Sequence, residues 1–139
     1  NFFTGTLKEG MFQMGSVRIE VPEGKMKVLR EQGYRGEEMI LGIRPEDFHD
    51  EPVFIDASPN TTVNINVEVA ELMGAEIMVY SQINGQNFVS RVDARTEVKA
   101  GQQMKLAIDM NKVHFFDSKT EIRIPLPTQT NKRREAGVL

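Results

Sequence analysis

Apolar and polar residues alternate with a period of two along much of the chain. Four stretches show this most clearly, residues 16–21, 63–69, 104–108 and 121–125. Successive side chains of a β-strand point to opposite faces, so each stretch offers one apolar face to a core and one polar face to water. The pattern therefore predicts a strand at each of these places.

A β-hairpin is predicted around Asn84 and Gly85. Apolar runs at residues 77–80 and 88–92 flank this pair. Asn-Gly tolerates positive φ angles at both central positions, which a two-residue hairpin turn requires. We therefore expect the two runs to pair as neighbouring antiparallel strands.

Evidence for helix is limited to one short segment. Residues 26–32 fit two helical turns ending at Gly33, but the adjacent Val28 and Leu29 suit a strand equally well. Together, the patterns give about ten short strands separated by Gly, Pro, Asn and Asp. Regular short strands favour a barrel or a sandwich, so the predicted fold class is all-β with little helix.

Two segments of the chain are similar to each other. Residues 36–43 and 101–108 share the pattern G-x-x-M-x-L-x-I. The similarity is either chance, since a turn glycine before an alternating strand is a simple pattern, or the trace of two related half-barrels.

Composition narrows the class of protein further. The chain has 139 residues, of which 40% are hydrophobic and 27% charged, as in one globular domain or two small ones sharing a core. Its formal net charge of -3 argues against a basic nucleic-acid-binding surface. The absence of cysteine excludes disulfides, thiolate zinc sites and cysteine nucleophiles. No apolar run approaches the roughly 20 residues of a membrane span.

The two ends of the chain suggest a piece of a longer protein. The first residue is Asn1 rather than methionine, and no basic and apolar leader follows it. We therefore expect part of the function to lie outside these residues. Residues 125–139 are mostly polar and begin with a proline-bounded stretch, so we predict a C-terminal tail there.

No phosphate-binding loop is predicted. Gly5 and Gly10 have the separation of the two glycines of such a loop. Met11 and Phe12 follow, where the loop needs a lysine and a hydroxyl residue. The residues that would carry the charge are therefore absent.

Neither histidine predicts a functional site. His49 lies in the acidic run at residues 46–51, whose density of carboxylates is typical of a solvated loop rather than of metal ligands at defined spacing. His114 shares one strand face with Phe116, and no nucleophile or orienting group accompanies it. We therefore predict no catalytic, cofactor-binding or metal-ligating residue in the chain.

Three segments carry a family resemblance. Residues 36–48 contain LGIRPE, residues 66–76 contain V-E followed by L-M-G-A-E, and residues 101–117 end in H-F-F-D. In this order and at these separations, they resemble the C-terminal regulatory domain of the ATP-binding subunit of maltodextrin and multiple-sugar ABC importers. Residues 1–3 are similar to the point where the nucleotide-binding domain of that family hands over to the regulatory domain.

The resemblance implies an OB-like and transport-associated OB (TOBE) β-barrel built from two intertwined parts. We expect residues 1–52 to form the OB-like part, residues 53–124 the TOBE part and residues 125–139 the tail. The implied role is non-catalytic regulation and dimerisation in a carbohydrate importer. In the parent chain, the catalytic domain that binds ATP and Mg would lie upstream.

The resemblance also implies partners and a location. We expect a homodimer formed through the regulatory domain, and contact with the transporter's membrane subunits through the parent chain. In some relatives a regulatory protein also binds this domain, whereas no nucleic-acid partner is implied. The implied location is the cytoplasmic side of the cell membrane, where the subunit is held peripherally by the transporter complex.

The family motifs select eight residues for structural or regulatory roles: Gly42, Arg44, Pro45, Glu46, Glu71, Gly74, Phe116 and Asp117. Pro45 biases the preceding residue toward extended geometry, so a strand is expected to end at Arg44. Arg44 is expected to form a forked pair with Glu46 or Glu71. Gly74 allows a turn that is closed to residues with a β-carbon.

The dimer face is expected on apolar strand surface near Gly74 and residues 115–116. The chain departs from the family at Ala75, because relatives often carry Asn after the turn glycine. Regulatory-protein contacts of the maltose branch are therefore not carried over to this chain.

Two other classes of function stay open on the sequence alone. The first is a stand-alone TOBE barrel that binds a small ligand or an oxyanion, as related molybdate-binding proteins do, although no convincing anion nest is evident. The second is an independent enzyme. ATP hydrolysis by the chain would support the second class, and we expect none.

Overall fold

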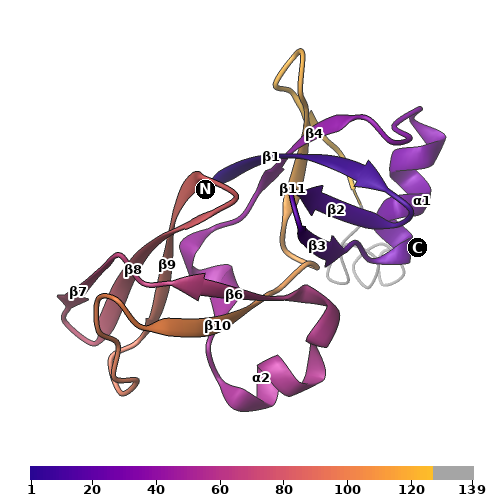
Figure 1. Cartoon of the computed structure of the whole chain (residues 1–139). Helices are drawn as coiled ribbons and strands as arrows, with labels where there is room; N and C mark the ends of the chain where they lie inside the picture. The colour runs from indigo at the N-terminus through magenta and orange to yellow at the C-terminus, as the bar shows by residue number, and fades with distance from the viewer. Residues whose placement is uncertain (127–139) are drawn as a thin grey trace, which may run out of the picture.

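Residues 1–126 are described by the computed structural model of the chain, and they form twelve strands, two α-helices and two 3-10 helices. The strands make one six-stranded sheet and two three-stranded sheets, in which all neighbours run antiparallel. Figure 1 shows the larger sheet on one side of the molecule and the two smaller sheets on the other. The mostly-β architecture confirms the predicted fold class.

The six-stranded sheet has the order β12-β11-β4-β1-β2-β3. Its strands are β1 (Phe2–Lys8), β2 (Met11–Met14), β3 (Val17–Glu20), β4 (Glu38–Gly42), β11 (His114–Asp117) and β12 (Arg123–Ile124). The last two strands of the described chain thus add to the sheet that the first four begin, beside β4 (Figure 1). This arrangement interleaves the two ends of the described chain.

The two smaller sheets come from the middle of the chain. One has the order β5-β10-β6, with β5 (Phe48–His49), β6 (Thr62–Asn66) and β10 (Gln103–Ile108). The other has the order β7-β8-β9, with β7 (Val69–Met73), β8 (Glu76–Ile83) and β9 (Gln86–Asp93). The helices are α1 (Glu23–Glu31), η1 (Pro45–Asp47), α2 (Pro52–Ala57) and η2 (Pro59–Thr61).

One hydrophobic core runs through all three sheets. Strand β1 alternates as an amphipathic strand should, with Phe3 and Leu7 turned into the core. Within the large sheet, the rings of Phe12 and Phe115 meet edge to face, with centroids 6.0 Å apart. The core therefore joins residues from the beginning, middle and end of the described chain.

The four strands expected from alternation are present as β3, β6, β10 and β12. The expected hairpin is also present as β8 and β9, and its two turn residues have positive φ, 50° at Asn84 and 74° at Gly85. The two similar segments, residues 36–43 and 101–108, contribute β4 and β10, which lie in different sheets.

The ambiguous segment after Pro22 is a helix, α1. Lys25, Met26 and Leu29 are buried, and the spacing of three to four residues places Leu29 on the same helical face as the other two. Helix α2 was not expected from the sequence, because its apolar residues 53–55 are consecutive rather than spaced three to four apart; in the structure none of its six residues is buried. Neither helix in the described part of the chain is long and apolar enough to cross a membrane.

Candidate functional site: a joint and an exposed apolar edge

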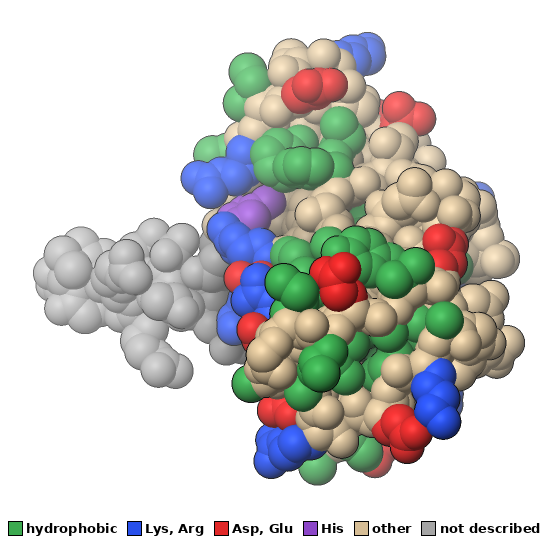
Figure 2. Space-filling view, turned by 90° about the vertical axis from the view of Figure 1, so that its left-hand side faces the viewer, with side chains coloured by type: hydrophobic (Ala, Val, Ile, Leu, Met, Phe, Trp, Pro, Cys, Tyr) green, Lys and Arg blue, Asp and Glu red, His purple; other side chains and the backbone are tan. Residues whose placement is uncertain are grey.

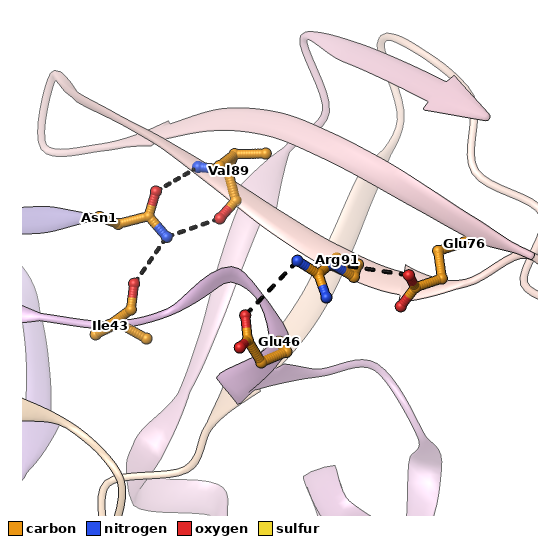
Figure 3. Close-up of polar contacts among 6 residues, drawn as sticks. All are labelled: Asn1, Ile43, Glu46, Glu76, Val89 and Arg91. Atoms are coloured by element: carbon orange, nitrogen blue, oxygen red, sulfur yellow. Dashed lines mark hydrogen bonds and ion pairs between the residues drawn. The ribbon is translucent and has the colours of Figure 1, made fainter. Parts of the chain in front are cut away.

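The side chain of Asn1 connects the large sheet to the β7–β9 sheet. Its Nδ2 donates hydrogen bonds to the carbonyl oxygens of Ile43, at 2.9 Å, and Val89, at 2.8 Å. Its Oδ1 accepts a hydrogen bond from the amide of Val89 at 2.8 Å. Figure 3 shows this amide lying against the backbone of β9 like a neighbouring peptide group. Backbone groups on the open edge of β9 thereby gain hydrogen-bond partners.

Gln86 makes a second contact of the same kind. Its Nε2 donates to the carbonyl oxygen of Thr4 at 2.8 Å, and its Oε1 accepts from the Thr4 amide at 2.7 Å. Between these two amide contacts, Phe88 packs against Phe3 and Phe48, with ring centroids 5.5 Å and 5.0 Å away. We call this region, Asn1, Phe3, Thr4, Phe48, Gln86, Phe88 and Val89, the joint.

Arg91 of β9 extends the joint with charge. Its guanidinium lies 3.9 Å from a carboxylate oxygen of Glu46 and 3.9 Å from one of Glu76 (Figure 3). The predicted pairing of Arg44 with Glu46 or Glu71 is wrong, because Arg44 makes no ion pair with another residue among 1–126. Pro45 begins the η1 turn directly after Arg44, and Glu46 within this turn reaches β9 instead.

Gly42, Phe116 and Asp117 support the β4–β11 end of the large sheet. A β-carbon at Gly42 would lie 2.9 Å from the ring of Phe116, so the pair packs too closely for a larger residue. Asp117 accepts hydrogen bonds from the amides of Lys119 and Thr120 and from the hydroxyl of Tyr34, all within 2.9 Å. These bonds lower the pKa of Asp117 to about 2, so the carboxylate holds the β11–β12 turn in its charged form.

The acidic run spreads over several elements rather than forming one cluster. No group of three or more His, Asp or Glu residues in the part of the chain described is placed to hold a metal ion. Asp47 is buried, and its Oδ2 lacks a hydrogen-bond partner among the described atoms. Burial raises the pKa of Asp47, with the nearby charge of Lys112 opposing the rise.

We expect Asp47→Asn to increase the unfolding free energy at neutral pH. The pKa of Asp47 in the folded chain lies above the ordinary value of 3.8, which applies to the unfolded chain. Such a carboxyl stabilises the fold fully at pH values below 3.8, and this stabilisation is lost as the pH rises through the folded-state pKa. The variant should therefore differ from the parent at about pH 7 and converge with it near pH 3, in urea denaturation. Asp56→Asn, on the exposed α2, is the control. A less stable Asp47→Asn protein at neutral pH would contradict the argument.

Strand β7 forms an exposed apolar edge. Leu72 and Met73 are 70% and 55% exposed, and Val69 of the same strand and Tyr80 of β8 are also exposed. Gly74, at φ 64°, makes the turn to β8, as the sequence predicts for a glycine. Figure 2 shows hydrophobic side chains reaching the surface on the face that carries these strands. We call Val69, Leu72, Met73 and Tyr80 the β7 patch.

The structure separates residues that the sequence grouped as one dimer face. Phe115 is fully buried in the core, so it cannot belong to an exposed face. Phe116, on the opposite side of β11, lines a surface hollow of about 280 Å³ with Phe2, Ile40 and Glu121. Glu71 is exposed beside the β7 patch and makes no ion pair with another residue among 1–126.

Sequence reasoning did not select Asn1, Gln86 or Arg91 for the joint. Their partners lie between 15 and 88 positions away along the chain. A polar residue at a strand end has many possible partners, and no local pattern marks one of them.

The chain matches two described domain families and several characterised proteins. Residues 1–48 match the MalK OB fold domain, and residues 57–115 match the TOBE domain. The chain is 54% identical over 124 residues to the oligosaccharides import ATP-binding protein MsmX of Bacillus subtilis, covering 89% of this chain and 34% of that one. It is 38% identical over 125 residues to the multiple sugar-binding transport ATP-binding protein MsmK of Streptococcus mutans, covering 89% and 33%.

The chain thus spans about a third of the length of these curated relatives. Among solved structures, it resembles the cytoplasmic molybdate-binding protein ModG, with a TM-score of 0.65 over 83% of this chain and 94% of that one. The sequence identity is 17%, so this likeness shows the fold alone.

Proposed function

Because the chain belongs to the family of MalK OB-fold and TOBE domains, we propose that it is a regulatory and dimerisation domain of the ATP-binding subunit of a sugar ABC importer. These domains are homologous to the C-terminal part of such ATP-binding subunits. Its role in this proposal is non-catalytic. The observation that supports the proposal is the β7 patch, an exposed apolar strand edge at which two copies would meet.

The two edges of the β7–β9 sheet support this proposal by their contrast. The outer edge of β9 is partly covered by the side chain of Asn1, which bonds to the backbone of Val89, and Gln86 of β9 bonds in turn to the backbone of Thr4 in β1. The outer edge of β7 has no strand beside it within residues 1–126, and its side chains are apolar. An uncovered apolar edge strand is a place where another chain adds or packs, and burying it removes apolar surface from water.

In the parent subunit, ATP and Mg would be held by a catalytic domain outside these residues. The domain would contact the importer's membrane subunits through that parent chain, on the cytoplasmic side of the cell membrane. By joining two subunits at the β7 patch, it would keep them associated while their ATPase domains separate. Linked contacts of this kind reinforce each other, so a weak interface in the isolated domain suffices in the whole subunit.

We expect Leu72→Asp to weaken self-association of the chain at least about tenfold, because a charge at the centre of an apolar interface must be desolvated. Sedimentation equilibrium over a range of concentrations gives the dissociation constants. Val53→Asp is the matched control, since Val53 is 82% exposed and lies on α2, away from the β7 patch.

Two outcomes would count against the proposed dimer. One is a parent chain that stays monomeric at the highest concentration reached. The other is equal weakening by Leu72→Asp and Val53→Asp, which would assign the effect to net charge rather than to the β7 patch. Circular dichroism of each variant confirms that the fold is retained.

A further inference from the structure

The water-facing side of the large sheet carries an apolar hollow beside the first residues of the chain. The hollow has a volume of about 280 Å³ and is lined by Phe2 of β1, Ile40 of β4, Phe116 of β11 and Glu121 of the β11–β12 turn. The three strands are direct neighbours in the sheet, in the order β11-β4-β1. Phe2 pairs with Gly42 and Phe116 pairs with Ile40, so the register brings the apolar side chains together. We call this site the Phe2 hollow.

The core does not require apolar residues on this side of the sheet. The core side of the same three strands is filled by Phe3, Leu41 and Phe115, which are fully buried. In a sheet with one face in water, the residues that alternate with them are expected to be polar. Thr6 and Glu38, which pair farther along β1 and β4, follow this expectation and are exposed. An apolar group on the water-facing side therefore marks a surface that another part of a protein covers.

Gly42 allows the Phe2 hollow to form. The rings of Phe2 and Phe116 meet edge to face, with centroids 5.4 Å apart. A β-carbon at Gly42 would lie 2.9 Å from the ring of Phe116 and 3.5 Å from the ring of Phe2. The two rings thus occupy the space that a side chain at this position would take, and each supports the other. A preformed apolar surface loses less side-chain entropy on binding than one that must first be ordered.

We propose that the Phe2 hollow receives an apolar surface of the ATP-binding domain of the same parent chain. This inference rests on the proposed function, which includes such a domain outside these residues. The chain is homologous to the C-terminal part of its curated relatives and spans about a third of their length. In those relatives, the larger part therefore precedes the region that matches this chain. A domain joined at Asn1 would begin one residue from Phe2.

The anchoring of Asn1 and the size of the Phe2 hollow favour a linked domain over a separate protein. The carbonyl oxygen of Asn1 accepts a hydrogen bond from the amide of Ile43 at 2.9 Å, and its side chain is bonded to Val89. These bonds hold Asn1 beside the hollow. An interface between separate proteins takes about 20–30 residues on each side, many more than the four described residues that line the hollow. A linked domain loses less freedom on contact, so a small surface suffices.

Hydrogen–deuterium exchange of the parent subunit and of the isolated chain tests the inference. Amides of residues 116–122 should exchange at least about tenfold more slowly in the parent subunit, because the docked domain restricts opening of β11 and its turn. Amides of α2 are the control and should exchange alike, since α2 packs against β10 of another sheet. Unchanged exchange at residues 116–122 in a subunit that binds ATP would overturn the inference. So would equal slowing of both segments, which would indicate general stabilisation.

Phe2→Asp tests the Phe2 hollow itself. Phe2 is 67% exposed, so the variant should leave the unfolding midpoint of the isolated chain nearly unchanged. In the parent subunit it should return the exchange of residues 116–122 to the rate of the isolated chain, because an ionised carboxylate against an apolar surface lacks a partner. Val53→Asp, at a residue of α2 that is 82% exposed, is the matched control and should keep the slow exchange. Equal effects of the two variants would overturn the site.

Leu72→Asp in the parent subunit separates this inference from the proposed dimer. The β7 patch belongs to another sheet, so residues 116–122 should keep their slow exchange when the variant weakens self-association. Loss of the slow exchange would place a second copy in the Phe2 hollow and overturn the inference. A parent chain without an ATP-binding domain would contradict the proposed function and, with it, the inference. An ATP-binding subunit that dimerises through the β7 patch but shows no slowing at residues 116–122 would contradict the inference alone.

Discussion

Phe88→Ala is expected to lose about 3–5 kcal/mol of unfolding free energy. Phe88 is 4% exposed, and its ring packs between Phe3 of the large sheet and Phe48 of the β5–β10–β6 sheet. Truncation would leave a cavity where all three sheets meet, and packed neighbours on different sheets can collapse into it only partly. Urea denaturation, monitored by circular dichroism, measures the loss.

Phe2→Ala is the matched control for this truncation. Phe2 is 67% exposed and meets one ring, that of Phe116, edge to face at 5.4 Å. Its removal should cost less than about 1 kcal/mol. If Phe88→Ala cost no more than Phe2→Ala, the joint would not be the contact that couples the sheets.

Local elements of this fold follow from sequence where the determining interactions are local. The β8–β9 hairpin depends on the Asn84-Gly85 turn and on alternation beside it, so the sequence predicts both its existence and its place. Helix α1 was ambiguous, because the adjacent Val28 and Leu29 suit a strand as well as a helix. Tertiary burial of Met26 and Leu29 decides between helix and strand.

Long-range pairing could not be predicted in the same way. Strand β11 joins β4 through the register of His114 with Gly42, although the two segments are far apart along the chain. Alternation correctly separates the buried Phe115 from His114 and Phe116 on the other face of β11, but it cannot choose the neighbouring strand. The family resemblance implied two intertwined parts, but it did not say which strands pair.

The candidate site residues divide in the same way, into those marked by a local sequence pattern and those that depend on distant partners. Gly74 was found from sequence, because a turn glycine beside apolar residues is a local pattern. The predicted pair of Arg44 with Glu46 or Glu71 is wrong, because Glu46 instead meets Arg91 of β9, a residue from another sheet. The contacts of Asn1 and Gln86 in the joint were missed, since their partners Val89 and Thr4 lie 88 and 82 positions away along the chain.

Gly5→Ala is expected to destabilise the chain by about 1–3 kcal/mol. Gly5 is the residue whose spacing to Gly10 imitates a phosphate-binding loop, but its place on β1 gives it a packing role. A β-carbon there would lie 2.6 Å from both the carbonyl oxygen of Gln13 and the ring of Phe12. Gln13 belongs to the strand paired with β1, so neither β2 nor the buried ring can move without disturbing the sheet.

Thr6→Ala is the control for this change, since Thr6 is the next residue on β1 and its side chain is exposed. It should shift the unfolding midpoint in urea only slightly, whereas Gly5→Ala should lower the midpoint clearly with an unchanged slope. A Gly5→Ala protein as stable as the parent would show that β1 and β2 can shift enough to accommodate a β-carbon at this position. The close approach of Phe12 would then not be what requires glycine on β1.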